Sequence, residues 1–191
     1  VAADGTDIKP LTKGAFDAMR IQSVDETGGW VYYIASPDNA AQRYLYRSRL
    51  NGSGTDERVT PKEFQGWNNY DFSPNSKWAV QTSSSFGQPS RIDLIKLADK
   101  SVARNIVTNN AVRSKLDKLA RGTHEFFRIE SEAGVSLDGW MMKPPNFDPT
   151  KKYPVLFYAY TEPAGTTVND QWSGAQYFWY LMLTQQGYIV A

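Results

Sequence analysis

The first half of the chain contains an internal repeat with an offset of forty-eight residues. Residues 24–30 (VDETGGW) align with residues 72–78 (FSPNSKW), and in the same register residues 43–46 (RYLY) align with residues 91–94 (RIDL). Each copy holds four short runs rich in the β-branched and aromatic residues that favour strands. We therefore expect strands near 19–24, 30–36, 43–50 and 56–60 in the first copy, and near 69–72, 77–82, 91–97 and 102–107 in the second.

Turn residues separate these runs: Thr27-Gly28-Gly29 in the first copy and Ser73-Pro74-Asn75-Ser76 in the second. Glycine supplies positive φ, proline presets φ, and Asn or Ser hydrogen-bonds its own turn. Four strands per unit at a period of about 40–50 residues are typical of a β-propeller blade. An ordinary antiparallel meander is the alternative. Because closed propellers have at least about four blades, the propeller interpretation predicts further chain before Val1 and after Ala191.

Composition excludes several classes of protein. Of the 191 residues, 41% are hydrophobic and 14% are aromatic, which favours a β-rich globular protein over a disordered one. A net charge of +1 gives no basic surface for nucleic acid, and no apolar run is long enough to cross a membrane. The chain has no cysteine and one histidine, and no metal-ligand spacing is visible, so we expect no disulfide, metal or cofactor.

A different pattern begins near residue 109. Residues 109–120 predict an amphipathic helix, with an Asn available as N-cap, Val112, Leu116 and Leu119 at helical spacing, and Gly122 as the C-terminal glycine. We interpret 109–122 as a linker helix between two domains.

The last seventy residues predict a mixed sheet. Runs 126–130 and 135–143 suggest an antiparallel pair joined by a turn at 131–134, and the apolar run 153–160 suggests a strand covered on both faces. Residues 175–186 predict a helix ended by Gly187, with its aromatic residues 177–180 buried, and 188–191 start another strand. Strand, helix and strand in this order indicate a β–α–β unit and hence parallel pairing.

Several of these segments resemble the dipeptidyl peptidase IV branch of the prolyl oligopeptidase family of serine peptidases. The most specific is Lys151-Lys152-Tyr153-Pro154 followed by an apolar strand that ends in Tyr160, with Pro163 three residues later. The others are residues 11–14 (LTKG), 31–33 (VYY), 43–46 (RYLY), 72–74 (FSP) and 137–140 (LDGW).

The resemblance implies a fold that is mainly β with some α/β. Residues 1–108 would form the C-terminal two blades of a β-propeller and residues 109–122 the linker helix. Residues 123–191 would form the N-terminal part of an α/β-hydrolase domain, before its nucleophile. In that fold the triad follows the first strands in the order Ser, Asp, His. The chain has no Gly-x-Ser-x-Gly, and its histidine, His124, precedes those strands. We therefore expect His124 to be a surface or junction residue and these residues alone to be inactive.

The implied activity is that of a serine exopeptidase that releases N-terminal X-Pro or X-Ala dipeptides. Its partners would be short peptides with proline or alanine in second place, with no cofactor, no nucleic acid and no membrane span. The resemblance also allows a homodimer of the full-length enzyme, and it implies a location in the periplasm, at the cell surface or outside the cell. Alternatives are a related oligopeptidase or acylaminoacyl-peptidase, and a propeller-type binding module without catalysis.

The resemblance implies one catalytic residue, Tyr160, as the hydroxyl donor to the oxyanion of the tetrahedral intermediate. One such donor contributes on the order of 3 kcal/mol. The alternative is a core aromatic whose hydroxyl reaches a backbone carbonyl. The sequence departs from the family where a glycine-rich turn is expected, because Thr161 and Glu162 precede Pro163. A carboxylate there would oppose the oxyanion unless it is paired or turned away, so we expect no catalytic use of Glu162. The residues that bind substrate stay unknown.

Overall fold

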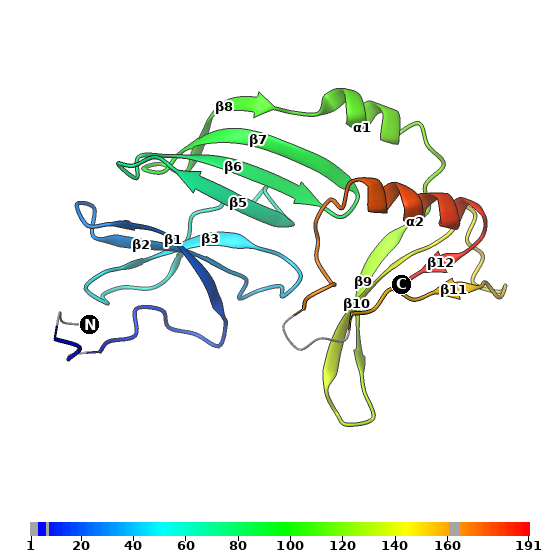
Figure 1. The fold of residues 1–191 in the computed structure, drawn as a ribbon, viewed down its shortest axis with the longest axis horizontal. Helices are drawn as coiled ribbons and strands as arrows, with labels where there is room; N and C mark the ends of the chain where they lie inside the picture. The colour runs from blue at the N-terminus through cyan, green and yellow to red at the C-terminus, as the bar shows by residue number, and fades with distance from the viewer. Residues whose placement is uncertain (1–3, 7, 161–164) are drawn as a thin grey trace. The chain divides into compact units, whose positions relative to one another are not determined.

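A computed structural model describes residues 4–6, 8–160 and 165–191. Within these residues the fold is mainly β, with antiparallel pairing dominant and two helices. The chain divides into two compact units (Figure 1). The first comprises residues 1–84 and 90–108, and the second comprises residues 85–89 and 109–191. The turn at 85–89, which we expected in the first part, thus belongs to the second unit.

The first unit consists of two four-stranded antiparallel sheets, one for each copy of the repeat (Figure 1). Strands follow one another in both sheets, in the orders β1-β2-β3-β4 and β5-β6-β7-β8. Their bounds are β1 (Ala18–Asp25), β2 (Trp30–Ala35), β3 (Tyr44–Arg49), β4 (Glu57–Arg58), β5 (Trp67–Phe72), β6 (Trp78–Ser85), β7 (Gln88–Lys96) and β8 (Ser101–Val107). All eight predicted strands are confirmed. β4 is shorter than predicted, and β6 and β7 extend further toward the turn that joins them.

The core of the first unit forms on both faces of strand β2. Successive side chains of a strand point to opposite faces. Tyr32 and Ile34 accordingly join a buried cluster that spans both sheets, whereas Tyr33 and Ala35 join a second cluster with residues of β3. The spanning cluster comprises Tyr32, Ile34, Leu45, Val59, Tyr70, Ala79, Ile95 and Leu97. Burial on both faces explains why β2 is almost uniformly apolar.

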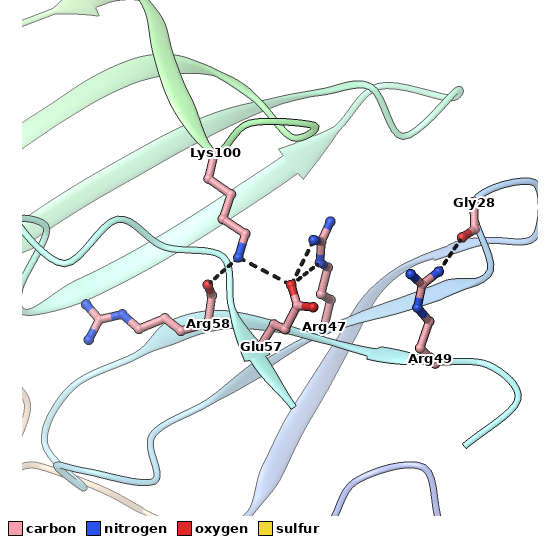
Figure 2. A network of polar contacts seen from close by, with 6 residues as sticks. All are labelled: Gly28, Arg47, Arg49, Glu57, Arg58 and Lys100. Atoms are coloured by element: carbon pink, nitrogen blue, oxygen red, sulfur yellow. Dashed lines mark hydrogen bonds and ion pairs between the residues drawn. The ribbon is translucent and has the colours of Figure 1, made fainter. Parts of the chain in front are cut away.

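An ion-pair network also joins the two sheets (Figure 2). Glu57 of β4 accepts hydrogen bonds from Arg47 Nε at 3.0 Å and Nη2 at 2.8 Å. Lys100, in the turn between β7 and β8, lies 3.3 Å from the same carboxylate and donates to the Arg58 carbonyl at 3.2 Å. The edge strand of the first sheet is thereby tied to a turn of the second.

The second unit contains a four-stranded sheet in the order β11-β12-β10-β9. The helices and strands of this unit are α1 (Asn110–Leu116), β9 (His124–Glu130), β10 (Ser136–Met142), β11 (Val155–Leu156), α2 (Ala175–Gln185) and β12 (Ile189–Val190). β11 and β12 pair in parallel, and α2 lies between them in the chain. The predicted β–α–β order and parallel pairing are confirmed, as is the turn at 131–134.

Helix α1 is shorter than predicted, because it ends at Leu116 with Asp117 as C-cap. Asn109 occupies the N-cap position with φ 53°, but its side chain makes no capping hydrogen bond. Only Leu116 on the expected apolar face is buried, whereas Val112 and Leu119 are exposed. A helix of seven residues depends on its tertiary contacts. Here they come from the buried Leu116 and from Arg113, whose guanidinium donates hydrogen bonds to the Gln88 side chain and the Pro89 carbonyl.

Gly122 does not end a helix, so that prediction is wrong. A Cβ at Gly122 would lie 1.9 Å from the Lys143 carbonyl oxygen. Glycine is therefore required here because two segments of backbone pass close to each other.

The prediction that residues 153–160 form a strand covered on both faces is wrong, because residues 154–160 are exposed, and the expected burial of residues 177–180 is only partly correct. β11 comprises two residues, and Phe157 and Tyr160 expose 77% and 53% of their surface. In α2, Tyr177 and Tyr180 are buried, but Phe178 and Trp179 are exposed. Among the described residues, other side chains cover only one side of α2, and β11 pairs only with β12. An apolar run does not specify how many of its faces find a partner.

Candidate functional site

Tyr160 lies four residues beyond β11, at the carboxyl end of the parallel strand pair. The Ala191 amide donates to the Leu156 carbonyl at 2.9 Å, and the Tyr158 amide donates to the Ala191 carbonyl at 2.6 Å. The pairing thus continues to Tyr158, and the chain leaves the sheet there. In open α/β sheets, ligands bind at the carboxyl ends of the strands. The backbone therefore delivers Tyr160 to the edge where such a site forms.

The side chain of Tyr160 is not buried. It exposes 53% of its surface, and none of the described residues hydrogen-bonds its hydroxyl. This environment differs from that of a core aromatic whose hydroxyl reaches a backbone carbonyl. It leaves the phenol open to a ligand, and its catalytic role stays a prediction. Thr161, Glu162 and Pro163 lie outside the described residues.

A cavity of about 210 Å³ lies beside the segment that leads to Tyr160. Tyr158 forms part of its wall, and Tyr160 is not among the lining residues. The remaining wall consists of three aromatic side chains and the polar residues that precede and begin α2: Phe86, Trp140, Tyr180, Thr166, Thr167, Asn169, Gln171, Ser173 and Gln176. Pockets for whole small-molecule ligands usually measure about 300–1,000 Å³, so this volume suits a side chain or a small ring.

Some of the polar groups that line this cavity have hydrogen-bond partners among the described residues, and one does not. Gln176 Nε2 donates to the Tyr180 hydroxyl at 2.5 Å, and burial raises the pKa of Tyr180, which keeps that hydroxyl protonated. Asn169 Nδ2 donates to the Thr166 carbonyl at 3.0 Å. Its Oδ1 is buried and has no partner among the described residues. A buried acceptor without a donor is costly, so Asn169 is suited to accept a hydrogen bond from a ligand or water.

Asp170 connects the loop before α2 to the turn at 85–89. Asp170 as a residue is 9% exposed, and its Oδ1 accepts a hydrogen bond from the Phe86 amide at 2.8 Å. The Phe86 ring is in turn the centre of an aromatic cluster, 5.0–6.0 Å from the ring centroids of His124, Phe126, Trp140 and Tyr177. Neither Asp170 nor Phe86 was predicted from the sequence as a site residue. An aromatic residue in a tight turn, where polar residues are usual, was the available signal.

His124 belongs to this cluster, where its ring stacks on Phe86 with centroids 5.2 Å apart. Burial lowers the pKa of His124, the Asp170 carboxylate opposes that shift, and Arg121 adds to it. The structure gives His124 a packing contact. Its neutral form is favoured at neutral pH.

The described residues contain no group of three or more His, Cys, Asp or Glu side chains that could hold a metal ion. None of the helices found in residues 4–6, 8–160 and 165–191 has the length and apolar character needed to cross a membrane.

Comparisons with known proteins agree with the geometry. Residues 1–90 match the family described as the dipeptidyl peptidase IV (DPP IV) N-terminal region. A probable dipeptidyl peptidase 4 of Emericella nidulans is 26% identical over 94% of this chain and 23% of its own length. A probable dipeptidyl-aminopeptidase B of Ajellomyces capsulatus is 30% identical over 94% of this chain and 19% of its own length.

The crystal structure of Porphyromonas gingivalis dipeptidyl peptidase 4 superposes with a TM-score of 0.87 and 26% identity, over 98% of this chain and 26% of that one. The chain therefore spans about a fifth to a quarter of the length of these relatives. The matches run through both units, from the repeat to the parallel strands. In sequence and fold, the chain is therefore similar to part of the dipeptidyl peptidase IV family.

Proposed function

We propose that these residues form part of a serine-type exopeptidase that releases dipeptides with proline or alanine in second place from peptide N-termini. The observation that carries the proposal is the superposition on a dipeptidyl peptidase 4, with a TM-score of 0.87 over 98% of this chain. The names of the fungal relatives support the same activity.

The proposed organisation follows the order of the elements. Residues 1–108 form two blades of a β-propeller, 109–122 a linker, and 123–191 the first part of an α/β-hydrolase domain. Two consecutive four-stranded sheets support the blades, and the parallel β11–α2–β12 unit supports the hydrolase domain.

Within this enzyme, Tyr160 donates its hydroxyl to the oxyanion that forms when the scissile carbonyl is attacked. A preorganised donor stabilises the charge that develops in the transition state more than it stabilises the substrate. The exposed phenol at the carboxyl end of the parallel strands supports this role. Residues 1–191 contain no Gly-x-Ser-x-Gly and only one histidine, so we expect no turnover from them alone.

The assay compares full-length protein containing these residues with residues 1–191 alone. We expect the full-length protein to release p-nitroaniline from Gly-Pro-p-nitroanilide, and a serine-directed phosphonate to abolish that release. Acetyl-Ala-p-nitroanilide, whose amino group is blocked, should not be cleaved. Cleavage of the blocked substrate alone would identify an acylaminoacyl-peptidase. Absence of any phosphonate-sensitive cleavage would favour a binding module and overturn the proposal.

A further inference from the structure

A second, larger cavity lies in the first unit, where the two sheets meet. It measures about 710 Å³, within the range of ligand-binding pockets. The turn between β1 and β2 forms one wall, the turn between β5 and β6 forms another, and residues of β2, β3 and the end of β7 complete it. It shares no lining residue with the cavity beside Tyr158. We call it the inter-sheet cleft.

The walls of the inter-sheet cleft are held in position by bonds between the sheets. Ser23 Oγ lies 3.0 Å from Ser76 Oγ, which joins β1 to the turn between β5 and β6. At the edge strand β4 of the first sheet, the Glu57 carboxylate accepts a hydrogen bond from Lys100, which lies in a turn of the second sheet (Figure 2). Both sheets also share one buried hydrophobic cluster. The cleft is therefore a preorganised feature of the unit, which lowers the entropic cost of binding a ligand.

The repeat places two equivalent tryptophans in the cleft, but only one has a free ring. The guanidinium carbons of Arg47 and Arg49 lie 4.0 and 3.7 Å from the Trp30 ring centroid. Trp78 is 37% exposed, and no ring or cation of the described residues stacks on it. Trp78 thus presents an apolar, planar surface to a ligand.

Two of the cationic side chains that line the cleft are paired within the protein. Arg47 is bonded to Glu57, and Lys96 Nζ lies 3.0 Å from Asp99 (Figure 2 shows the Glu57 network). Three lining charges of both signs, Asp25, Glu26 and Lys77, have no ion-pair partner among the described residues, and the Asp25 carboxylate accepts a hydrogen bond from the Gly28 amide at 2.8 Å. A strongly anionic or cationic ligand would therefore find no field of one sign. A neutral ligand with both donors and acceptors fits better.

We propose that the inter-sheet cleft binds a short neutral oligosaccharide. A sugar ring has an apolar face of C–H groups, which suits stacking on Trp78, and a rim of hydroxyls that both donate and accept. Glu26 accepts from such hydroxyls and Lys77 donates to them. This inference is independent of the proposed peptidase activity, since it uses only residues of the first unit.

The test is NMR on full-length protein labelled with 5-fluorotryptophan. Cellotriose, maltotriose and N,N′-diacetylchitobiose are titrated, together with myo-inositol hexakisphosphate and the peptide Gly-Pro-Gly. We expect at least one neutral saccharide to shift the Trp78 resonance, which is assigned from Trp78→Phe. Trp78→Ala should weaken that binding at least about ten-fold, equivalent to roughly 1.4 kcal/mol. Trp179→Ala is the matched control, because Trp179 is an exposed tryptophan of the second unit and should leave the affinity unchanged.

Three results would overturn the inference. One is the absence of a shift with all three saccharides. Another is a shift with the hexakisphosphate or the peptide only, which would identify an anion or peptide site. The third is saccharide binding that survives Trp78→Ala. If Trp78→Ala fails to fold, Glu26→Gln and Lys77→Met, both at exposed positions, replace it, and unchanged affinity in both variants counts against the inference.

Discussion

The carboxylate of Asp170 accepts a hydrogen bond from the backbone amide of Phe86 at 2.8 Å, across 84 positions of the chain. The bond holds the turn at 85–89 against the loop that precedes α2. Both residues are buried, so little water competes for the hydrogen bond between the amide and the carboxylate. The loop that follows Tyr160 is thereby fixed at one point, so the stability of this contact bears on the candidate site.

Removing the Asp170 carboxylate should destabilise the second unit. Asp170→Ala leaves the buried Phe86 amide without its charged acceptor, which costs about 1.5–3 kcal/mol. Urea unfolding, monitored by near-ultraviolet circular dichroism, measures the change in the free energy of unfolding. Asp71, an exposed residue of β5 with no side-chain partner among the described residues, provides the control. Asp71→Ala should change the free energy of unfolding by less than about 0.5 kcal/mol. Equal effects of the two substitutions would refute the special role of Asp170.

Truncating Phe86 should cost more than removing its hydrogen bond. The ring contacts four aromatic side chains, and Phe86→Ala opens a cavity among them, with an expected loss of about 3–5 kcal/mol. Phe178→Ala removes an exposed aromatic of α2 and should cost far less. Thermal unfolding of both variants distinguishes them. A Phe86→Ala variant as stable as the wild type would show that the cluster does not hold the turn.

The second unit should lose stability as the pH falls from above to below about 6.5, the ordinary pKa of histidine. Burial lowers the pKa of His124 in the folded state, so between the folded and unfolded values the unfolded chain binds more protons. The free energy of unfolding therefore decreases as the pH falls through this window. Residues 1–191 contain one histidine, and the Cε1 proton signal that disappears in His124→Gln reports its folded pKa. A measured value at or above 6.5 contradicts the prediction, and His124→Gln should remove this pH dependence.

The Glu57 network should contribute little to stability and should be sensitive to acid. Arg47 and, less strongly, Lys100 lower the pKa of Glu57. The contribution is therefore present above the unfolded pKa of Glu57 and is lost as the pH falls through the lower folded value. Because the Glu57 side chain is 39% exposed, solvent screens the pair, and Glu57→Gln should cost less than about 1 kcal/mol at pH 7. Unfolding curves at pH 7 and pH 3 test this, and a variant that keeps the full acid sensitivity would exclude Glu57 as its source.

In the full-length enzyme, Tyr160→Phe should lower kcat by about 10²–10³ with little change in KM, since the lost bond forms mainly in the transition state. Tyr158→Phe is the matched control, because Tyr158 lines the neighbouring cavity and precedes Tyr160 by two residues. Steady-state kinetics with Gly-Pro-p-nitroanilide give both constants. An unchanged kcat in Tyr160→Phe would remove the residue from the mechanism.

Local sequence patterns determined which segments form strands and helices. The repeat and its turn residues predicted all eight strands of the first unit, because alternation of side chains and glycine-containing turns are local properties. The apolar run before Tyr160 and the helix after it predicted the parallel β11–α2–β12 unit for the same reason. The segment around Tyr160 was likewise identified from the sequence, through its resemblance to a family.

Tertiary structure alone decided which faces are buried and which distant residues meet. It ended α1 at Leu116, exposed Phe157, and joined Asp170 to Phe86. It also brought equivalent turns of the two repeats to opposite walls of one cleft, with Trp30 covered and Trp78 open. These outcomes depend on contacts between residues far apart in the chain, and a contact of that kind leaves no periodic trace in the sequence around either partner.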